Sequence, residues 1–379
     1  MKSKNNFLVL FIILFSVSFV MAQEKKAKYT PEKLRQNFEN IKELDGKIFY
    51  ELRLFRNPFI GLYEIRKVTG DTTKNRFVPL FQGMPVGKYQ FGDNMNYSPL
   101  TKKERKAYLA QSNFPLHLKN YKADFWIQPY FAANFGNKNI PVQSNTSLGL
   151  QTQVFIRPGL SFSTGVIFPL VSQLDNRPNI IHLAATFLNQ FYAAGNHFFS
   201  ASAGTFYTDQ YGLNFQYRYA NLAKPWSFGV EAGLTGTYYY PKGGIYYNAM
   251  DELLLLADAS YRFAKPNLTV KLQAGQFLWS DKGARIEMVR QFTNVELGVY
   301  ATKTINGSTL GFNFAVPIPP GKIFQGKNAR LRTTDEFRWE YTYTRGYKIG
   351  ERYRVGYQLD QKLRQYHQDY LNTQYQQLK

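Results

Sequence analysis

The sequence contains no cysteine. This excludes disulfides, thiolate metal ligands, cysteine nucleophiles and the acylated cysteine of a lipoprotein. Histidine is rare, with four residues, and acidic residues number 26 against 47 basic ones, which gives a formal net charge of +21. Long apolar runs are scarce as well: the run at residues 7–20 is shorter than the roughly 20 residues that a membrane-spanning helix needs. The chain is therefore neither a disulfide scaffold nor a thiol enzyme, and we expect no transmembrane helix.

The first 22 residues have the layout of a secretory signal peptide. Lys2 and Lys4 form a positive start, residues 7–20 are apolar, and small residues precede a cleavage site after Ala22. A retained membrane anchor is the alternative, and the short apolar run argues against it. We expect an exported protein.

Apolar and polar residues alternate through most of the chain after residue 120. In residues 211–219 every odd position is large and apolar or aromatic, and every even position is Gly, Asn, Gln or Arg. A β-strand sends successive side chains to opposite faces, so this segment has one apolar and one polar face. In an exported protein whose mean hydropathy is only −0.38, the pattern predicts an all-β fold: an antiparallel transmembrane β-barrel of about 12 to 14 strands in the outer membrane.

Aromatic residues are abundant, with 28 Tyr and 32 Phe. They suit the girdles that flank the lipid-facing band of a barrel. A secreted β-sandwich or jelly roll also alternates and is also rich in Tyr. It remains the alternative, although roughly 250 residues of nearly continuous strand would be large for a single sandwich.

The chain divides into four predicted parts. These are the signal peptide at 1–22, a small mixed α/β periplasmic domain or plug at 23–120, the barrel at 121–358, and a helical tail at 359–379. The predicted wall strands are separated by turns rich in Pro, Asn and Gly. They cover residues 121–133, 145–156, 159–169, 180–191, 197–206, 210–219, 226–239, 252–263, 267–278, 284–292, 294–303, 308–316, 334–345 and 350–358.

Within the N-terminal part, a helix is predicted up to Gly46, because four apolar residues recur at helical spacing: Leu34, Phe38, Ile41 and Leu44. Two strands are predicted after it, at 47–55 and 60–68. A second helix is predicted to start at Thr101, where Thr101 and Glu104 form a capping-box pattern. Near the other end, residues 348–355 resemble the β-signal of barrel assembly.

Several motifs go beyond general barrel features. They follow one another in the order Phe168-Pro169-Leu170, Leu174-Asp175-Asn176-Arg177, Ser202-Ala203-Gly204-Thr205-Phe206, Lys224-Pro225-Trp226, Gly275-Gln276-Phe277-Leu278, Asp281-Lys282-Gly283, Ala301-Thr302 and Phe314-Ala315-Val316-Pro317. Over about 155–320 this series resembles the YjbH-type family of exopolysaccharide (capsule) biosynthesis proteins. The resemblance implies an outer-membrane β-barrel that serves production or export of an extracellular polysaccharide.

Two groups of residues are candidates for binding. The first surrounds the Asp281-Lys282-Gly283 turn. A tight hairpin turn is its structural interpretation, and a polar cluster that meets an anionic sugar is its functional one; this cluster comprises Asp281, Lys282, Gly283, Arg285 and Arg290. The second group consists of basic residues in the polar register of the strands, which would make the lumen electropositive if they point inward: Arg218, Lys271, Lys303, Arg338 and Arg354. Alternatively, such basic residues cluster outside the lipid band and bind lipid headgroups.

Enzymatic chemistry has little support in the sequence. None of the four histidines (His117, His182, His197 and His367) stands in a Ser/His/Asp or metal-ligand spacing. We expect a noncatalytic protein without cofactor or metal. Its expected partners are outer-membrane lipid and lipopolysaccharide, an anionic polysaccharide and other export proteins, but not nucleic acid. A general porin or secretion barrel, and a lipid- or glycan-modifying barrel enzyme, are the alternatives.

Overall fold

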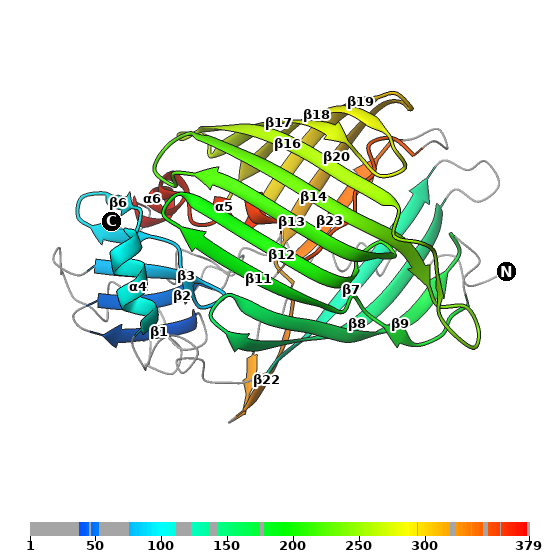
Figure 1. Ribbon diagram of the computed structural model, residues 1–379, viewed down its shortest axis with the longest axis horizontal. Helices are drawn as coiled ribbons and strands as arrows, with labels where there is room; N and C mark the ends of the chain where they lie inside the picture. The colour runs from blue at the N-terminus through cyan, green and yellow to red at the C-terminus, as the bar shows by residue number, and fades with distance from the viewer. Residues whose placement is uncertain are drawn as a thin grey trace, which may run out of the picture. The chain divides into compact units, whose positions relative to one another are not determined.

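The computed structural model describes residues 38–44, 47–52, 76–110, 123–135, 142–174, 178–293, 295–318, 323–326, 328–334, 336–343, 348–356 and 358–376. The expected signal peptide, the predicted strand at 60–68 and His117 lie outside these residues. All described residues belong to one unit, Arg35–Lys379. This part of the chain is mostly β, with one large antiparallel sheet, one small sheet and short helices (Figure 1).

The large sheet is a continuous antiparallel ladder in chain order. Its strands are β7 (Ala123–Phe135), β8 (Val142–Arg157), β9 (Leu160–Ser172), β11 (Phe187–Ala194), β12 (His197–Phe206), β13 (Gln210–Ala220), β14 (Trp226–Tyr239), β16 (Glu252–Phe263), β17 (Leu268–Gln276), β18 (Lys282–Gln291), β19 (Glu296–Thr304), β20 (Gly307–Val316) and β23 (Phe337–Thr342). The predicted strands at 197–206, 226–239 and 252–263 are confirmed with the same bounds.

Four shorter strands attach to this ladder. β10 (His182–Leu183) pairs with β9, and β15 (Tyr246–Tyr247) pairs with β14. β21 (Ile323–Gln325) and β22 (Ala329–Thr333) form a hairpin, and β22 runs parallel to β7.

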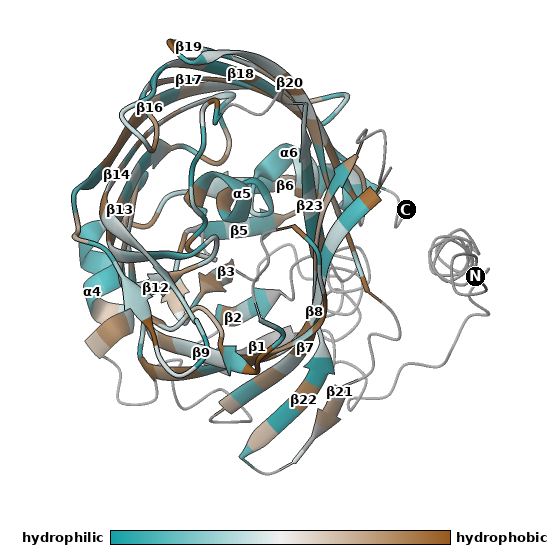
Figure 2. Cartoon of the chain, turned by 90° about the vertical axis from the view of Figure 1, so that its right-hand side faces the viewer, coloured by the Kyte–Doolittle hydropathy of each residue, from teal (hydrophilic) through white to brown (hydrophobic). Residues whose placement is uncertain are grey.

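The ladder is strongly curved, so that its first and last long strands come side by side. Phe131 of β7 lies 6.1 Å from Trp339 of β23 between ring centroids, and Phe135 lies 6.0 Å from Tyr341. Figure 2 shows the strands arranged around helix α5 (Leu359–Arg364). The sheet therefore has a concave face, which surrounds this helix, and a convex face.

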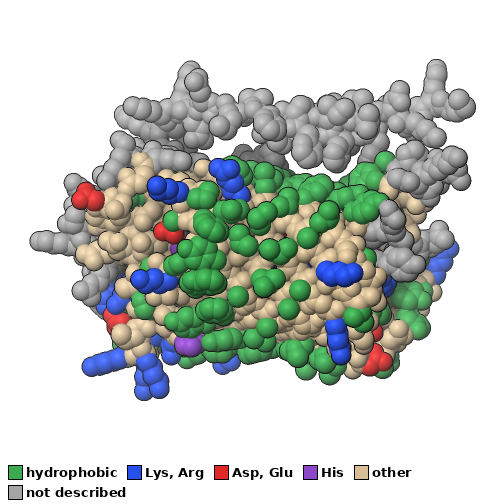
Figure 3. Space-filling view, turned by 90° about the horizontal axis from the view of Figure 1, so that it is seen from above, with side chains coloured by type: hydrophobic (Ala, Val, Ile, Leu, Met, Phe, Trp, Pro, Cys, Tyr) green, Lys and Arg blue, Asp and Glu red, His purple; other side chains and the backbone are tan. Residues whose placement is uncertain are grey.

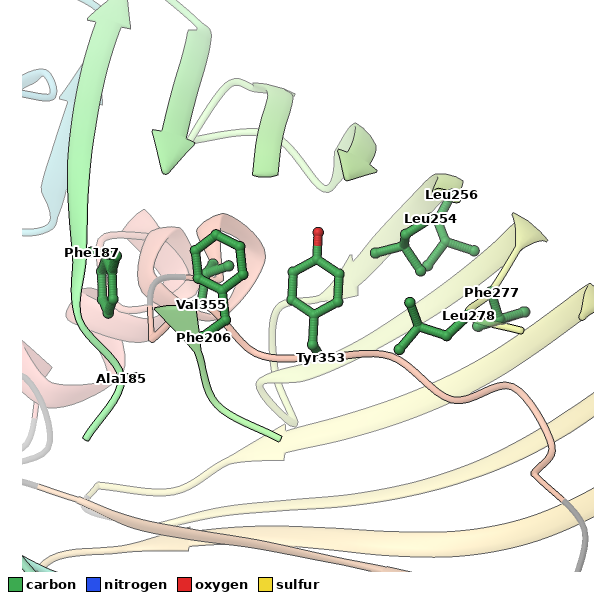
Figure 4. Close-up of a cluster of buried hydrophobic side chains, with 9 residues drawn as sticks. All are labelled: Ala185, Phe187, Phe206, Leu254, Leu256, Phe277, Leu278, Tyr353 and Val355. Carbon is green, nitrogen blue, oxygen red and sulfur yellow. The ribbon is translucent and has the colours of Figure 1, made fainter. Parts of the chain in front are cut away.

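The predicted strand at 350–358 is wrong. Residues 348–356 run as an extended segment along the concave face, with one isolated bridge between Arg354 and Tyr207. Tyr353 and Val355 are fully buried there in an apolar cluster (Figure 4). Gly233 makes room for this contact, because a Cβ at that position would lie 1.7 Å from the Tyr353 hydroxyl oxygen.

Helices follow this extended segment, as predicted for the tail. α5 is followed by α6 (Gln368–Gln376). We call residues 348–356 together with 358–376 the inner segment. The alternating sequence of its first part predicts extended backbone correctly, but Tyr353 and Val355 are buried in the interior cluster and this part has no ladder pairing beyond the single bridge, so it is not part of the wall.

The large sheet has its apolar side chains outside and its polar ones inside. In β13, Leu213, Phe215 and Tyr219 are 54%, 43% and 37% exposed on the convex face, whereas Asn214, Gln216 and Arg218 are no more than 5% exposed. The same arrangement holds along β14 and β16 to β20. Figure 3 shows one side of this surface, where hydrophobic side chains cover the middle and most charged ones lie toward the two ends.

Aromatic side chains form a row on the convex face at one end of the large sheet. Cross-strand pairing places Tyr192 beside Phe199, Tyr219 beside Phe228, and Trp226 beside Tyr261. Neighbouring rings in the row are in contact, as in Trp226 and Tyr261, whose centroids are 4.9 Å apart. We call this row the aromatic belt: Tyr192, Phe199, Tyr217, Tyr219, Trp226, Phe228, Tyr261 and Phe263.

The small sheet is mixed and carries one helix. Its order is β1-β2-β3-β5-β6, with β4 paired to β3. The elements are β1 (Phe38–Leu44), β2 (Lys47–Leu52), β3 (Arg76–Phe81), β4 (Met84–Pro85), β5 (Lys88–Phe91), β6 (Met95–Ser98) and α4 (Lys102–Ala110). Its buried core consists of Phe49, Val78, Leu80, Leu100 and Tyr108.

The two helix predictions for this part of the chain have opposite outcomes. The helix from Thr101 is confirmed with its capping box: the Glu104 backbone N–H donates to the Thr101 hydroxyl, and the Thr101 N–H donates to the Glu104 carboxylate. The helix predicted through Leu44 is wrong at Phe38–Leu44, which is β1 and pairs antiparallel with β2. Pairing with an apolar neighbouring strand outweighs the helical spacing of three side chains.

The α6 helix connects the small sheet to the large one. The Met95 N–H donates to Asn372 and the Tyr97 N–H donates to Gln368, both across to α6. His367 lies just before α6, 8% exposed, with Nε2 3.1 Å from the Lys224 backbone oxygen and Nδ1 accepting from the Asp369 N–H. This pattern fits a neutral imidazole with its proton on Nε2. Burial, assisted by Arg262, lowers the pKa of His367 to about 3.

Acidification should therefore loosen α6. Below an unfolded pKa of about 6.5, the opened form binds a proton that the packed form does not, so this contribution to stability is complete above that pH and declines as pH falls toward 3. Between pH 7 and 5 we expect the opening of α6, measured by hydrogen exchange corrected for intrinsic rates, to rise roughly tenfold or more. His367→Gln keeps a donor but cannot titrate, so it should remove most of this rise. An equal rise in the variant would contradict the assignment.

Candidate functional site

The concave face of the large sheet carries a continuous series of ion pairs. Lys271 lies 3.1 Å from Glu287 and 2.6 Å from Asp360. Arg364 lies 3.7 Å from Asp360 and 3.4 Å from Glu296. The series continues in both directions and ends on residues of the inner segment, in the order Arg354–Glu340–Arg285–Glu287–Lys271–Asp360–Arg364–Glu296–Arg338–Glu336–Lys362.

Two charges of α5 stand at the centre of this series. Burial acts to raise the pKa of the Asp360 carboxyl, but Lys271 and Arg364 outweigh it and hold that pKa well below its usual range. Burial acts to lower the pKa of Arg364, and the carboxylates of Glu296 and Asp360 raise it instead. Both groups are therefore charged over the whole physiological range, and they fix α5 against β17 and β19.

A second contact fixes the extended part of the inner segment. Arg352 lies 2.8 Å from Glu231 of β14 and also donates to Gln273 and Gln358. Glu231 accepts a further hydrogen bond from Asn214. Glu231 lies 121 positions before Arg352 and on another element, so sequence reasoning missed this pair.

Four of the five predicted lumen residues lie on the concave side. Arg218 of β13 and Lys271 of β17 are 5% exposed, Arg338 belongs to β23, and Arg354 belongs to the inner segment. Lys303 is the exception and is exposed on the convex side. It shares the register of Leu297 and Val299, whose side chains are 49% and 51% exposed.

The expected electropositive character is not found at these four residues. Each has a carboxylate partner within 2.8 Å: Asp258 for Arg218, Asp360 for Lys271, Glu296 for Arg338 and Glu340 for Arg354. The partners lie on other strands or on the inner segment, 14 to 89 positions away in the sequence. At these four positions the concave face therefore carries ion pairs rather than a positively charged path.

Asp281 is buried and holds neighbouring backbone segments together, so it does not form an exposed ligand-binding turn. The side chain is 1% exposed, and its carboxylate accepts hydrogen bonds from the backbone N–H of Gly350 at 2.8 Å and of Asn306 at 3.3 Å. Asp281 thus links the β17–β18 and β19–β20 turns to the start of the inner segment. The positive φ angles of the turn belong to Trp279 and Ser280.

The tight hairpin turn predicted at Asp281-Lys282-Gly283 would have Gly283 at a positive φ, and this is wrong. This residue begins the β18 ladder, where a Cβ would lie 2.1 Å from the Lys303 backbone oxygen. A glycine is required here for close approach of two strands.

The remaining members of the predicted cluster do not lie together. Lys282 is exposed on one face of β18, whereas Arg285 is 6% exposed on the other, 3.1 Å from Glu340 and stacked on the Tyr300 ring at 3.5 Å. Arg290 is exposed at the far end of β18, over the Phe292 ring. A single anionic sugar cannot meet these three cations at once.

The described histidines have structural neighbours. His182 stacks on Tyr240, and His197 lies 2.9 Å from the Tyr217 hydroxyl. No group of three or more His, Cys, Asp or Glu residues that could hold a metal ion occurs in the described part of the chain. Nor does any helix described there have the length and apolar character needed to cross a membrane.

The Glu231–Arg352 pair gives a direct test of how the inner segment is held. Either single reversal, Glu231→Arg or Arg352→Glu, buries two like charges, and breaking such a pair costs about 3–5 kcal/mol. Because the chain has no cysteine, Val355→Cys provides a unique thiol inside the apolar cluster. We expect either reversal to speed its alkylation roughly a hundredfold or more, and the double exchange to restore most of the protection.

The matched control is the exposed Lys348–Glu351 pair, with atoms 3.9 Å apart. Lys348→Gln should change the alkylation rate little, since exposed pairs contribute about 0–1 kcal/mol. Equal rates in all variants would show that this ion pair does not hold the inner segment.

Comparison with known proteins adds one finding to this geometry. Searches of curated proteins and of solved structures give no match. The family model described as exopolysaccharide biosynthesis protein YbjH matches residues 176–319. The matched region begins after β9 and contains every strand from β10 to β20, with Lys271, Arg285, Glu287 and Glu296 of the ion-pair series. It confirms the resemblance found in the motifs. Over residues 176–319 the chain is therefore similar to the YjbH-type family of exopolysaccharide biosynthesis proteins.

Proposed function

We propose that the protein is a noncatalytic outer-membrane β-barrel that assists production or export of an extracellular polysaccharide. The family match supports the link to exopolysaccharide. One observation supports the membrane most strongly: the large sheet buries polar and charged side chains on its concave face and exposes large apolar ones on its convex face. A soluble fold would have the opposite distribution, whereas a lipid-facing wall requires this one.

Closure of the sheet into a barrel is part of this proposal. An open edge in lipid would leave backbone N–H and C=O groups without partners, at a cost of several kcal/mol each. The approach of β7 and β23 through Phe131–Trp339 and Phe135–Tyr341, together with the hydrogen bond from the Thr334 N–H to the Ile127 oxygen, supports closure at this seam.

The orientation follows from the connections between strands. At the end that contacts the small sheet, the links 158–159, 195–196, 221–225 and 264–267 are short and the link 317–336 is long; the other end carries the longer links 173–186 and 240–251 beside short ones at 207–209 and 305–306. Most links at the small-sheet end are thus short. Outer-membrane barrels have short periplasmic turns and longer extracellular loops. We therefore place the small sheet in the periplasm. The exposed Lys282 and Lys303 would then lie at the outer surface, where lipopolysaccharide phosphates are available.

The occupied interior favours an assisting or gated role over a general porin. α5 and the extended part of the inner segment lie inside the sheet and are held there by ion pairs to β14, β17 and β19. A porin lumen is a polar channel filled with water. Passage of a polymer would require displacement of the inner segment; a scaffold for the export machinery would not.

An arginine on the convex face tests the membrane assignment. Phe215 lies in the middle of β13 and is 43% exposed. At the centre of a bilayer, Phe215→Arg should cost about 2–4 kcal/mol and reduce the folded, heat-modifiable fraction in outer-membrane preparations. Tyr247→Arg, in the 240–251 link and 67% exposed, is the matched control and should have little effect. Equal tolerance of both, with the protein soluble in the periplasm, would reject the barrel.

The polysaccharide role is tested in a deletion strain. We expect less extracellular polysaccharide, or polymer of altered length, and recovery on complementation with the natural chain. Complementation with Lys282→Glu, an exposed position, should succeed. Arg285→Glu should fail, because it would place a third carboxylate beside Glu340 and Glu287. If the deletion strain makes unchanged polymer, and the protein of the parent strain is found in the outer membrane, the polysaccharide role is refuted. The barrel assignment would then still stand.

A further inference from the structure

Helix α4 lies where the small sheet meets the outside of the large sheet. Figure 1 shows it in front of the small sheet, and Figure 2 shows it at the outer side of the wall near β12. Arg105 fixes this position, because its guanidinium donates to the Ala193 backbone oxygen at 2.6 Å and lies 4.9 Å over the Tyr192 ring. Tyr192 is 41% exposed and belongs to the aromatic belt. Through Arg105, α4 is thus directly attached to the belt.

The exposed side of α4 is strongly basic. Lys102, Lys103 and Lys106 are all exposed, and within the described part of the chain no carboxylate pairs with any of them. The acidic residue of the helix is engaged elsewhere: Glu104 caps the helix through Thr101 and lies 2.7 Å from Lys88. Three cations on two turns, with no counter-charge of their own, form a surface that attracts anions.

The position of this surface identifies the anion. In the proposed barrel, the aromatic belt marks the boundary between hydrocarbon and headgroups in the leaflet that faces the small sheet. A helix attached to this belt from the periplasmic side lies at the level of lipid phosphates. Lysines at an anionic membrane surface each contribute to attachment, and the attraction fades within a Debye length.

We propose that Lys102, Lys103 and Lys106 bind the phosphate groups of anionic phospholipids in the periplasmic leaflet, so that α4 anchors the small sheet to the membrane surface. This inference rests on the proposed membrane barrel. It adds a lipid-binding site outside the region of the family match, residues 176–319. Through the small sheet and α6, the site is also connected to the inner segment, because β6 donates hydrogen bonds to α6.

The test uses the full chain in nanodiscs and its lack of cysteine. Ala107→Cys, exposed on α4, carries a fluorophore, and Asn96→Cys, exposed on β6, carries the control label. Discs of phosphatidylcholine are compared with discs in which phosphatidylglycerol replaces part of it, each containing a lipid with a spin-labelled headgroup as quencher. We expect strong quenching at position 107 in the anionic discs, little at position 96, and a decrease in 1 M salt, where the Debye length is about 3 Å.

Charge variants decide whether the lysines are responsible. The triple variant Lys102→Glu, Lys103→Glu, Lys106→Glu should lower the affinity of α4 for the anionic surface about a hundredfold or more and remove the quenching. It should still fold, because acidic residues are favourable in the first turn of a helix. The corresponding triple Lys→Arg variant should retain the quenching.

Equal quenching in both kinds of disc and in the Glu variant would overturn the lipid site and attribute the contact to geometry alone. If the protein inserts into discs but position 107 is not quenched, the lipid site is overturned and the barrel assignment stands. Failure to enter discs at all would overturn the membrane assignment, and the lipid site with it.

Discussion

Pairing of buried charge is the constraint on which the rest of the structure depends. A wall with an apolar convex face must place its polar residues on the concave face, where they are shielded from water. Breaking a buried pair there costs about 3–5 kcal/mol, because it leaves one charge without compensation. Wall strands supply part of the compensation, as in Arg218–Asp258. For Lys271, Glu296 and Glu231, the inner segment supplies it through Asp360, Arg364 and Arg352.

The inner segment therefore has two effects. It neutralises buried charges of the large sheet, and it fills space on the concave side of that sheet. Its connection to the small sheet makes these two roles interdependent. Tyr366 donates to the Leu80 backbone oxygen, and Tyr375 donates to that of Gly92, so the inner segment also fixes the small sheet. Any partner that moves the small sheet acts on the same helices that carry Asp360 and Arg364. This arrangement couples the position of the small sheet to the state of the interior of the large sheet.

The sequence predicts the wall well because one rule governs it. Strict alternation with turns between strands gives β12, β14 and β16 with the bounds the structure has. It fails where the same pattern serves another purpose. Residues 352–355 alternate like a wall strand, but Tyr353 and Val355 face an interior apolar cluster. The error at Phe38–Leu44 is local: the Asp45-Gly46 dipeptide that follows has the sequence of a two-residue hairpin turn, a signal that favours β1 and β2 over a helix.

The candidate site could be predicted only in part, for a physical reason. Alternation determines on which face a side chain lies, and it correctly places Arg218 and Lys271 on the concave face. Applied strictly to β19 it also places Lys303 with Leu297 and Val299 on the convex face. It cannot give the net charge of the interior, because that depends on which carboxylate meets each cation. Asp360 lies 89 positions after Lys271 and on a different element. A surplus of positive charge in the sequence is thus compatible with a neutralised interior, provided that the unpaired cations lie elsewhere. The exposed lysines of α4, Lys282 and Lys303 have no carboxylate partner among the described residues, and in the proposed barrel they lie where anionic headgroups would compensate them.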